Sequence, residues 1–201
     1  MKVTRKSAVE NSATRAAIIE ATARLIYEEG YAAATSRRVG AKAGVRPPLI
    51  HYYFRTMDDL YAAVVRRMSE QALDRIEKAL KSERPFQAVW AVVANPRWAR
   101  FTMEFMALAN QNNTVREVIA QQIEKVRRLE VQALARHLEA RCVSAKLPLL
   151  VGPVLMTAAS YLLTLEAALG VSLGHAETKA YVEAFLRACE SGEDQPEGIR
   201  R

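Results

Sequence analysis

One arginine, one histidine, two tyrosines and a phenylalanine lie between Arg46 and Phe54, in the first third of the chain. An arginine can donate two hydrogen bonds to the edge of a guanine, and tyrosine hydroxyls can donate to phosphate oxygens. His51 has no histidine, cysteine or carboxylate at ligand spacing, so we expect no metal site here. These residue types therefore favour contact with a nucleic acid.

The charge distribution supports a polyanionic partner for the same region. The chain carries 29 lysine and arginine residues against 22 acidic residues, a formal net charge of +7. Residues 1–55 hold ten basic and four acidic residues, so six of the seven surplus charges lie there. Nucleic acid is the expected partner, and an anionic membrane surface is the less favoured alternative.

Three helices are expected to position these side chains. Apolar residues at helical spacing predict a first helix from about residue 14 to the glycine at residue 30. A second short helix is capped by Thr35 or Ser36 and ends at Gly44. A third covers 48–54, with a proline in its first turn. Two short helices joined by a tight turn form a helix-turn-helix arrangement.

The third helix is expected to present one face to DNA. Ile50 and Phe54 share a face and should pack inward. This orientation turns Pro48, Leu49 and Tyr52 outward. It places His51 and Tyr53 at the sides of the helix. A helix of this length, about 10 Å, fits the major groove with its N-terminal end against the bases. The predicted DNA contacts are Ser36, Arg37, Arg46, Pro47, Pro48, Leu49, His51, Tyr52, Tyr53 and Thr56.

Different roles are expected within this set. Arg46 is the best candidate for a base contact, while Arg37 and the polar arm at 2–12 would supply sequence-independent attraction. Backbone N–H groups at the helix starts near Ser36 and Thr56 can donate to phosphates. The two arginines could instead be ordinary solvated charges, and Tyr53 an ordinary core residue.

The TetR (tetracycline-repressor) family has a DNA-binding signature that this chain resembles. The resemblance lies in Gly44-Val-Arg-Pro-Pro-Leu-Ile-His-Tyr-Tyr-Phe54, followed by Arg55-Thr-Met-Asp-Asp-Leu60. The family's junction between its first two helices is similar to Gly30-Tyr31 before Ala34-Thr35-Ser36. The resemblance covers roughly residues 14–61 and implies a dimeric regulator with an N-terminal helix-turn-helix.

The chain departs from the family pattern at positions that matter for base contacts. Pro47-Pro48 stands where members often carry a small or polar residue and a glycine, and Leu49 replaces a usual threonine or serine. His51 replaces a usual tyrosine, and Met57 stands where a lysine is common. The operator sequence therefore cannot be inferred by analogy.

The expected fold is all-α with two functional domains. The N-terminal arm and helix-turn-helix DNA-binding domain would occupy 1–55. A helical ligand-binding and dimerisation domain would occupy 56–190, with a connector helix at 56–81, and a disordered tail would occupy 191–201. The connector's apolar residues recur every four positions, which suits a helix that contacts one body early and another late.

A ligand site is expected in the helical body. Aromatic and methionine side chains gather between residues 86 and 106, which suits either an adaptable apolar pocket or an ordinary core. Polar residues embedded near them are further candidates. The predicted ligand residues are Phe86, Trp90, Trp98, Phe101, Met103, Phe105, Met106, Asn110, Tyr161 and Glu166.

The segment 148–169 is apolar nearly all round, which predicts burial on two sides. One side would pack on its own body, and the other would join the last helix, 176–189, in a four-helix interface between two subunits. The candidate interface residues are Leu155, Leu162, Tyr181 and Phe185. A membrane-spanning alternative for 147–165 is disfavoured by its prolines, glycine and hydroxyl residues and by the lack of a basic flank.

No nucleotide-binding, hydrolase or metalloprotease motif is present, so we expect neither an enzyme nor a cofactor. Cys142 and Cys189 are too few for a disulfide scaffold, and no apolar signal segment is visible, which favours a cytoplasmic location. The leading hypothesis is a homodimeric regulator, favoured as a repressor, that a small hydrophobic molecule releases from double-stranded operator DNA. A helical DNA-binding or adaptor protein without ligand control, or an all-helical enzyme, are the alternatives.

Overall fold

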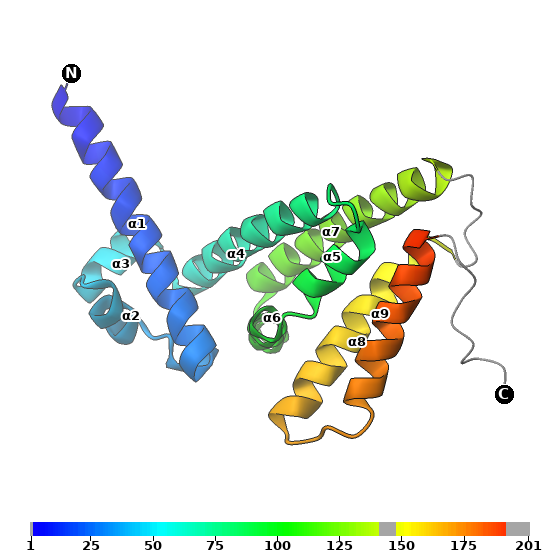
Figure 1. Cartoon of the computed structure of the whole chain (residues 1–201). Helices are drawn as coiled ribbons and strands as arrows, with labels where there is room; N and C mark the ends of the chain where they lie inside the picture. The colour runs from blue at the N-terminus through cyan, green and yellow to red at the C-terminus, as the bar shows by residue number, and fades with distance from the viewer. Residues whose placement is uncertain (1, 141–147, 192–201) are drawn as a thin grey trace. The chain divides into compact units, whose positions relative to one another are not determined.

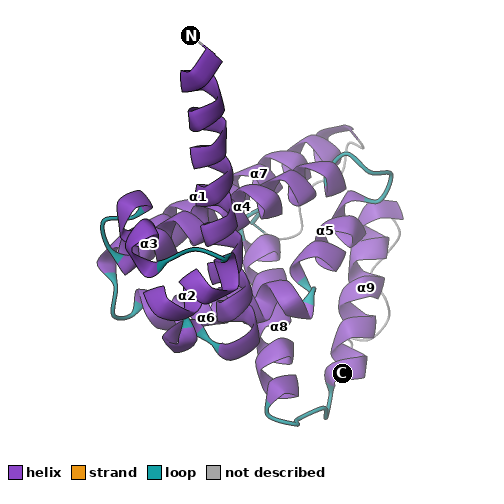
Figure 2. Cartoon of the chain, turned by 90° about the vertical axis from the view of Figure 1, so that its left-hand side faces the viewer, coloured by secondary structure: helices purple, strands orange, loops and turns teal. Residues whose placement is uncertain are grey.

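The computed structural model describes residues 2–140 and 148–191, with the side chains of 2–10 and 140 left out. Its elements in chain order are α1 (Lys2–Glu29), η1 (Tyr31–Ala33), α2 (Ser36–Ala43), α3 (Pro47–Tyr53), α4 (Met57–Ala79), α5 (Pro85–Val93), α6 (Pro96–Ala109), α7 (Asn113–Ala140), α8 (Val151–Ala168) and α9 (His175–Ser191). The described part contains helices and connecting turns but no strand, which confirms the all-α fold class (Figure 1, Figure 2). Cys142 and all but the first residue of the predicted tail lie outside the described residues.

The N-terminal arm is the main error in the predicted elements. Residues 2–12 were expected to be a flexible arm, but α1 begins at Lys2 and runs without interruption to Glu29. No glycine or proline lies between these two residues, so nothing in the backbone chemistry stops the helix from extending toward the N-terminus. The side chains of Lys2, Arg5 and Lys6, expected to attract DNA, lie outside those described.

The chain divides into two compact units. Unit 1 comprises Met1–Glu70 and Phe101–Gln122, and unit 2 comprises Gln71–Arg100 and Ile123–Arg201. Helices α4, α6 and α7 each contribute residues to both units, so neither unit is one continuous segment. The functional division at residues 55 and 56 stays a prediction.

In unit 1, α1 packs on η1 and α2, and α2 packs on α3. The core between them contains Ile18, Val39 and Ile50, all without exposed surface, together with Leu60 at the start of α4. Burial of an aliphatic side chain of this size contributes roughly 1.5–3 kcal/mol. This core holds α3 in place by its apolar face.

In unit 2, α5 packs on α8 and α9 around an apolar cluster. The aromatic rings of Phe86 and Trp90 lie in this cluster, which also takes in residues from the end of α4 and from α9. The Glu190 carboxylate accepts hydrogen bonds from the backbone N–H of Phe86 (2.6 Å) and of Gln87 (3.1 Å). These two N–H groups lack partners inside α5, so Glu190 caps that helix from a position 104 residues away along the chain.

Helix α8 carries much apolar surface that its own chain leaves uncovered. Leu155, Leu162 and Leu165 are about half exposed, at 58%, 54% and 47%. Within the described residues α8 is also the one helix long and apolar enough to cross a membrane, by length and composition alone, and 17% of it is buried. One such helix is weak evidence for a membrane span.

Candidate nucleic-acid interface

A tight turn fixes α3 against α2. The side chain of Thr35 caps α2 by accepting a hydrogen bond from the backbone N–H of Arg38, at 3.4 Å. Gly44 then ends the helix in the left-handed conformation, with φ of 69°. A Cβ atom on Gly40 would lie 2.8 Å from the backbone oxygen of Val45, so the chain can close this turn because residue 40 has no side chain.

The turn presents the outer face of α3 as the sequence predicted. Ile50 is fully buried and Phe54 is 3% exposed, whereas Leu49 is 36% and Tyr52 is 72% exposed. Pro48 and His51 are exposed as well. This confirms the orientation of the helix, and the roles of its residues in binding stay a prediction.

Tyr53 is tied into the domain rather than free at its edge. Its hydroxyl donates a hydrogen bond to Asn11 Oδ1 at 2.9 Å, which joins α3 to α1. Its ring meets that of Tyr52 edge to face, with centroids 5.1 Å apart. Tyr53 therefore supports the exposed Tyr52 ring, and its hydroxyl would have to exchange one partner to contact a phosphate.

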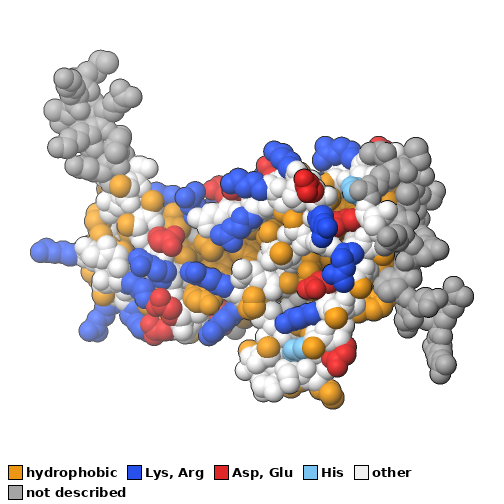
Figure 3. All heavy atoms as spheres, viewed as in Figure 1, with side chains coloured by type: hydrophobic (Ala, Val, Ile, Leu, Met, Phe, Trp, Pro, Cys, Tyr) orange, Lys and Arg blue, Asp and Glu red, His pale blue; other side chains and the backbone are white. Residues whose placement is uncertain are grey.

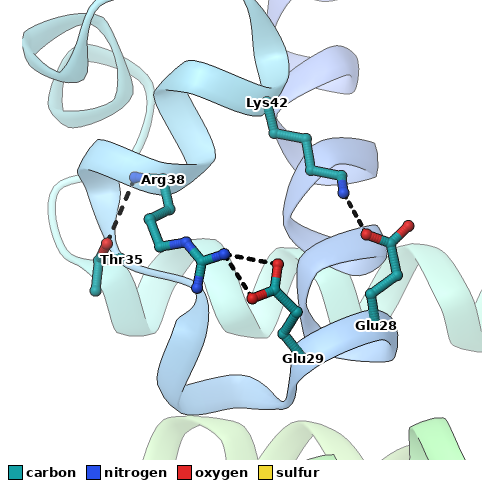
Figure 4. A network of polar contacts seen from close by, with 5 residues as sticks. All are labelled: Glu28, Glu29, Thr35, Arg38 and Lys42. Carbon is teal, nitrogen blue, oxygen red and sulfur yellow. Dashed lines mark hydrogen bonds and ion pairs between the residues drawn. The ribbon is translucent and has the colours of Figure 1, made fainter.

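The basic residues of α2 are in two different states. Arg38 pairs with Glu29 at 2.5 Å and Lys42 pairs with Glu28, so both charges are neutralised against the end of α1 (Figure 4). The hydrogen bond from Arg38, with its positive charge, holds the pKa of Glu29 below its usual range. By contrast, the side chain of Arg37 is exposed to solvent, as a phosphate contact requires.

Arg46 has the geometry expected of a base-reading side chain. It is exposed and occupies the cap position before α3, with φ of −74° and ψ of 142°, and Pro47 and Pro48 begin the helix behind it. Its side chain therefore leaves the chain at the end of the helix that is expected to point into the groove. Figure 3 shows lysine and arginine side chains standing out from the surface formed by α2 and α3.

The two predicted backbone phosphate sites differ in quality. Ser36, half-buried, opens α2 directly before two arginines. At the start of α4, however, the Thr56 N–H donates to Asp59 Oδ2 and the Asp59 N–H donates to Thr56 Oγ1, both at 3.1 Å. This capping box uses the polar groups of Thr56 and places Asp58 and Asp59 beside them, which disfavours a phosphate there.

Two hydrogen bonds to the junction between α1 and α2 were not predicted from the sequence. The Tyr61 hydroxyl in α4 donates to the backbone oxygen of Ala34 at 3.0 Å. Glu104 in α6 accepts from the backbone N–H of Tyr31 at 3.3 Å. Burial, with a smaller effect of the Asp58 charge, raises the pKa of Tyr61. Side chains of α4 and α6 thus hold η1 from two separate helices, and no local sequence signal marks this pairing.

The predicted ligand residues fall into two separate groups. Phe101, Met103, Phe105, Met106 and Asn110 lie in unit 1, whereas Phe86, Trp90, Trp98, Tyr161 and Glu166 lie in unit 2. In unit 1 the rings of Phe101 and Phe105 pack at 4.6 Å between centroids. In unit 2 the rings of Phe86 and Trp90 belong to the apolar cluster. Their roles in ligand binding stay a prediction.

Two of the polar ligand candidates have structural partners instead. Glu166 Oε2 lies 2.9 Å from His175 Nε2, and this pair joins the end of α8 to the start of α9. Asn110 is exposed, and its backbone oxygen accepts from the Arg116 guanidinium at 3.1 Å. Both contacts stabilise turns between helices, a role the sequence pattern did not separate from ligand binding.

One carboxylate that the sequence analysis did not select is buried in unit 2. Glu130 in α7 is 7% exposed, and burial raises its pKa to about 7 while the charge of Arg127 opposes the shift. Val126 and Leu134, four residues to either side, both pack against the apolar cluster. A glutamate at an apolar position of a helical repeat is the signal that could have identified it.

The predicted subunit contacts also differ among themselves. Leu155, Leu162 and Tyr181 are exposed at 58%, 54% and 40%. Phe185 is half-buried and packs against the apolar cluster of its own unit. The first three residues can therefore face a second subunit, and Phe185 is occupied within its own chain.

Comparisons with known proteins match this geometry. The sequence profile described as "Bacterial regulatory proteins, tetR family" matches residues 18–64. The chain is 33% identical over 69 residues to the HTH-type transcriptional regulator PksA of Bacillus subtilis, covering 34% of each protein. It is 31% identical over 133 residues to the HTH-type transcriptional regulator BetI of Brucella anthropi, covering 65% of this chain and 66% of BetI. The chain thus matches about a third of PksA and just under two thirds of BetI.

Solved structures share the fold over most of the chain. A transcriptional regulator from Saccharomonospora viridis in complex with choline has a TM-score of 0.73 at 16% identity, covering 88% of this chain and 96% of that one. A TetR-family regulator from Mesorhizobium loti has a TM-score of 0.72 at 16% identity, covering 90% and 97%. At these identities the likeness shows a common fold.

Proposed function

This chain belongs to the tetR family of DNA-binding transcriptional regulators, and we propose that it is a cytoplasmic, homodimeric repressor that a small molecule releases from its operator. The family is not enzymatic, which sets the enzyme alternative aside. In this proposal residues 1–55 bind DNA, and residues 56–190 bind the effector and form the dimer.

The observation that carries the proposal is the exposed face of α3. Ile50 anchors the helix in the core, while Leu49 and Tyr52 on α3 and Arg46 directly before it are exposed to solvent. Arg46 would contact a guanine edge, Leu49 a thymine methyl group, and Tyr52 a phosphate. Arg37 would add attraction to the phosphate backbone.

Uncovered apolar surface supports the dimer. Leu155 and Leu162 lie seven residues apart in α8, which places them on one face of the helix, and Tyr181 adds an exposed ring in α9. An apolar face of this kind on two neighbouring helices suits a symmetric interface between identical subunits. Two subunits would then place two α3 helices on one operator.

Two contacts within unit 1 support the proposed release by an effector. Tyr61 and Glu104 hold the segment between α1 and α2 from helices α4 and α6, which both continue into unit 2. A ligand that binds one arrangement of these helices more tightly would shift the population away from the DNA-binding form. The choline complex of the S. viridis regulator supports a small-molecule effector for this fold.

The proposal is tested with the full chain and the DNA upstream of its own gene. We expect fluorescence anisotropy to show specific binding whose affinity falls steeply as salt increases, because counterions are released from the phosphates. Scrambled DNA of the same length is the control. Binding that is absent, insensitive to salt, or equal on both DNAs would contradict the proposal.

A further inference from the structure

We propose that Glu28 and Glu29 limit the attraction of the DNA-binding domain to DNA of any sequence, by holding two cations of α2 away from the phosphates. This inference rests on the proposed function, since it concerns how strongly the regulator binds DNA outside its operator. A repressor meets a large excess of such DNA, so its sequence-independent affinity decides how much protein is left to occupy the operator.

The geometry of two ion pairs is the first argument. Glu28 and Glu29 are the last two residues of α1, and Arg38 and Lys42 lie one turn apart on the same face of α2. The Nη2 atom of Arg38 donates to both carboxylate oxygens of Glu29, at 2.6 and 2.5 Å. Lys42 Nζ donates to Glu28 Oε2 (Figure 4). Each of the two cations is therefore turned toward α1 and held there by a carboxylate of its own.

The composition of the domain is the second argument. Residues 1–55 contain four acidic residues, and Glu28 and Glu29 are two of them. Both pair with basic side chains of α2, whereas the exposed Arg37 of that helix pairs with no carboxylate among the described side chains. Of the three cations of α2, one is thus left to attract phosphate and two are neutralised.

The exposure of the two pairs favours an electrostatic role over a structural one. The side chains of Arg38 and Glu29 are 45% and 41% exposed, and those of Lys42 and Glu28 are 27% and 47% exposed. Ion pairs in contact with water add only modestly to stability, because water screens the charges. The buried apolar core of unit 1 does more to hold the helices together. What the two carboxylates change most is the charge that α2 presents to its surroundings.

Counterion release sets the size of the expected effect. Each phosphate that a protein neutralises steepens the fall of log affinity with log salt concentration by about 0.9. An arginine or lysine freed on α2 would therefore steepen this dependence by about one for each cation. It would also strengthen binding to DNA of any sequence, about three- to tenfold at roughly 0.1 M salt.

The test measures binding of the full chain to scrambled DNA across a salt series. Glu29→Gln removes the carboxylate that holds Arg38, and Glu28→Gln removes the one that holds Lys42. Both glutamates are exposed, so these changes leave the core intact. We expect each variant to bind scrambled DNA about three- to tenfold more tightly than the wild type, with a slope steeper by about one. Fluorescence anisotropy gives both quantities.

Two further variants separate the release of a cation from a change in net charge. Glu20→Gln makes the same charge change in α1, but Glu20 is exposed and pairs with no cation among the described side chains. Its affinity for scrambled DNA should therefore rise much less. The double substitution Glu29→Gln with Arg38→Gln removes both members of one pair and should restore the wild-type affinity.

Three results would overturn the inference. They are an unchanged affinity of Glu28→Gln or Glu29→Gln for scrambled DNA, an equal gain in Glu20→Gln, and a gain in Glu29→Gln that persists when Arg38 is also replaced. Pairs that only fasten α2 to α1 would give the first of these, with lower melting temperatures. If the wild type still binds its operator specifically, only this inference fails. Absence of any DNA binding by the wild type would instead remove the proposed function itself.

Discussion

At the scale of single residues, the arginines of the helix-turn-helix show why charge alone does not identify a DNA contact. Arg38 and Arg37 are neighbours in α2, yet Arg38 is paired with Glu29. The pairing stabilises the packing of α2 on α1, whereas an exposed arginine can attract phosphate. Sequence placed all of these charges in one region, but only the structure separated those that fasten helices from those that face solvent.

Arg46→Ala is expected to weaken binding to the operator by about 1–3 kcal/mol and to relax base preference at one position of each half-site, because it would remove the proposed base contact. Arg37→Ala should weaken binding to all DNA sequences alike. It should also reduce the slope of log affinity against log salt concentration by about one. Anisotropy titrations on operator and scrambled DNA separate the two effects. Arg75→Ala, an exposed arginine of unit 2, is the control that should change neither.

Glu130 is expected to make stability depend on pH. Its folded-state pKa is about 7, against 4.5 for an unperturbed glutamate, so the folded chain holds this proton over a pH range where the unfolded chain has lost it. The free energy of unfolding should therefore fall as pH rises from 4.5 to 7, by up to about 3 kcal/mol.

Urea titrations at several pH values would measure this slope in the wild type and in Glu130→Gln. The variant should lose most of it, because a glutamine has no proton to release. Glu124→Gln, on the same helix but with a 65% exposed side chain, should keep it. A wild-type slope that survives in Glu130→Gln would show that another group causes it. The ion pair of Glu29 with Arg38 makes stability depend on pH only below pH 4.5. This pairing is lost as the pH falls through the lowered pKa of Glu29.

At the scale of elements, most helices could be predicted because their start and stop signals are local. The hydroxyl cap at Thr35, the glycine at position 44 and the prolines that open α3, α5 and α6 all mark helix ends as expected. The start of α1 was predicted wrongly, because polar composition suggested a loop where no residue breaks the helix. Polarity is a weaker indicator of loop structure than glycine or proline.

Gly40→Ala is expected to disturb the turn that presents α3. Its new Cβ would lie 2.8 Å from the backbone oxygen of Val45, and backbone cannot move aside as a flexible side chain can. We expect a loss of roughly 1–3 kcal/mol in stability, together with weaker DNA binding. Gly152→Ala, in α8 with no atom within 4 Å of the new Cβ, is the matched control and should be neutral or slightly stabilising. Thermal unfolding of both variants checks this, and equal melting temperatures would contradict it.

At the scale of the whole molecule, apolar side chains of α8 and α9 are exposed. No described part of the chain covers them. Leu155 and Leu162 remain exposed although each would favour burial. The apolar composition of this segment led to two opposing interpretations, a membrane span and a subunit interface. Membership in a family of DNA-binding regulators favours the interface.

The double substitution Leu155→Glu with Leu162→Glu is expected to convert the proposed dimer to a monomer, because four carboxylates would be placed at the proposed interface without partners. Light scattering coupled to gel filtration measures the mass directly. Ala91→Glu, at an exposed position of α5, adds a charge elsewhere and should leave the dimer intact. A double variant that stays dimeric would place the interface on another face.

The all-α class, the helix-turn-helix and the outward face of α3 could be inferred from the order of the amino acids. These depend on local propensity, on capping residues and on the 3.6-residue period, which can all be read along one segment. The fold had to be known to see that Glu190 caps α5, that Tyr61 and Glu104 hold the junction of α1 and α2, and that Glu130 is buried. Each of these depends on which distant side chains or backbone groups meet in the folded chain, because the pairing of polar groups and their loss of hydration are set by packing and not by neighbours in sequence.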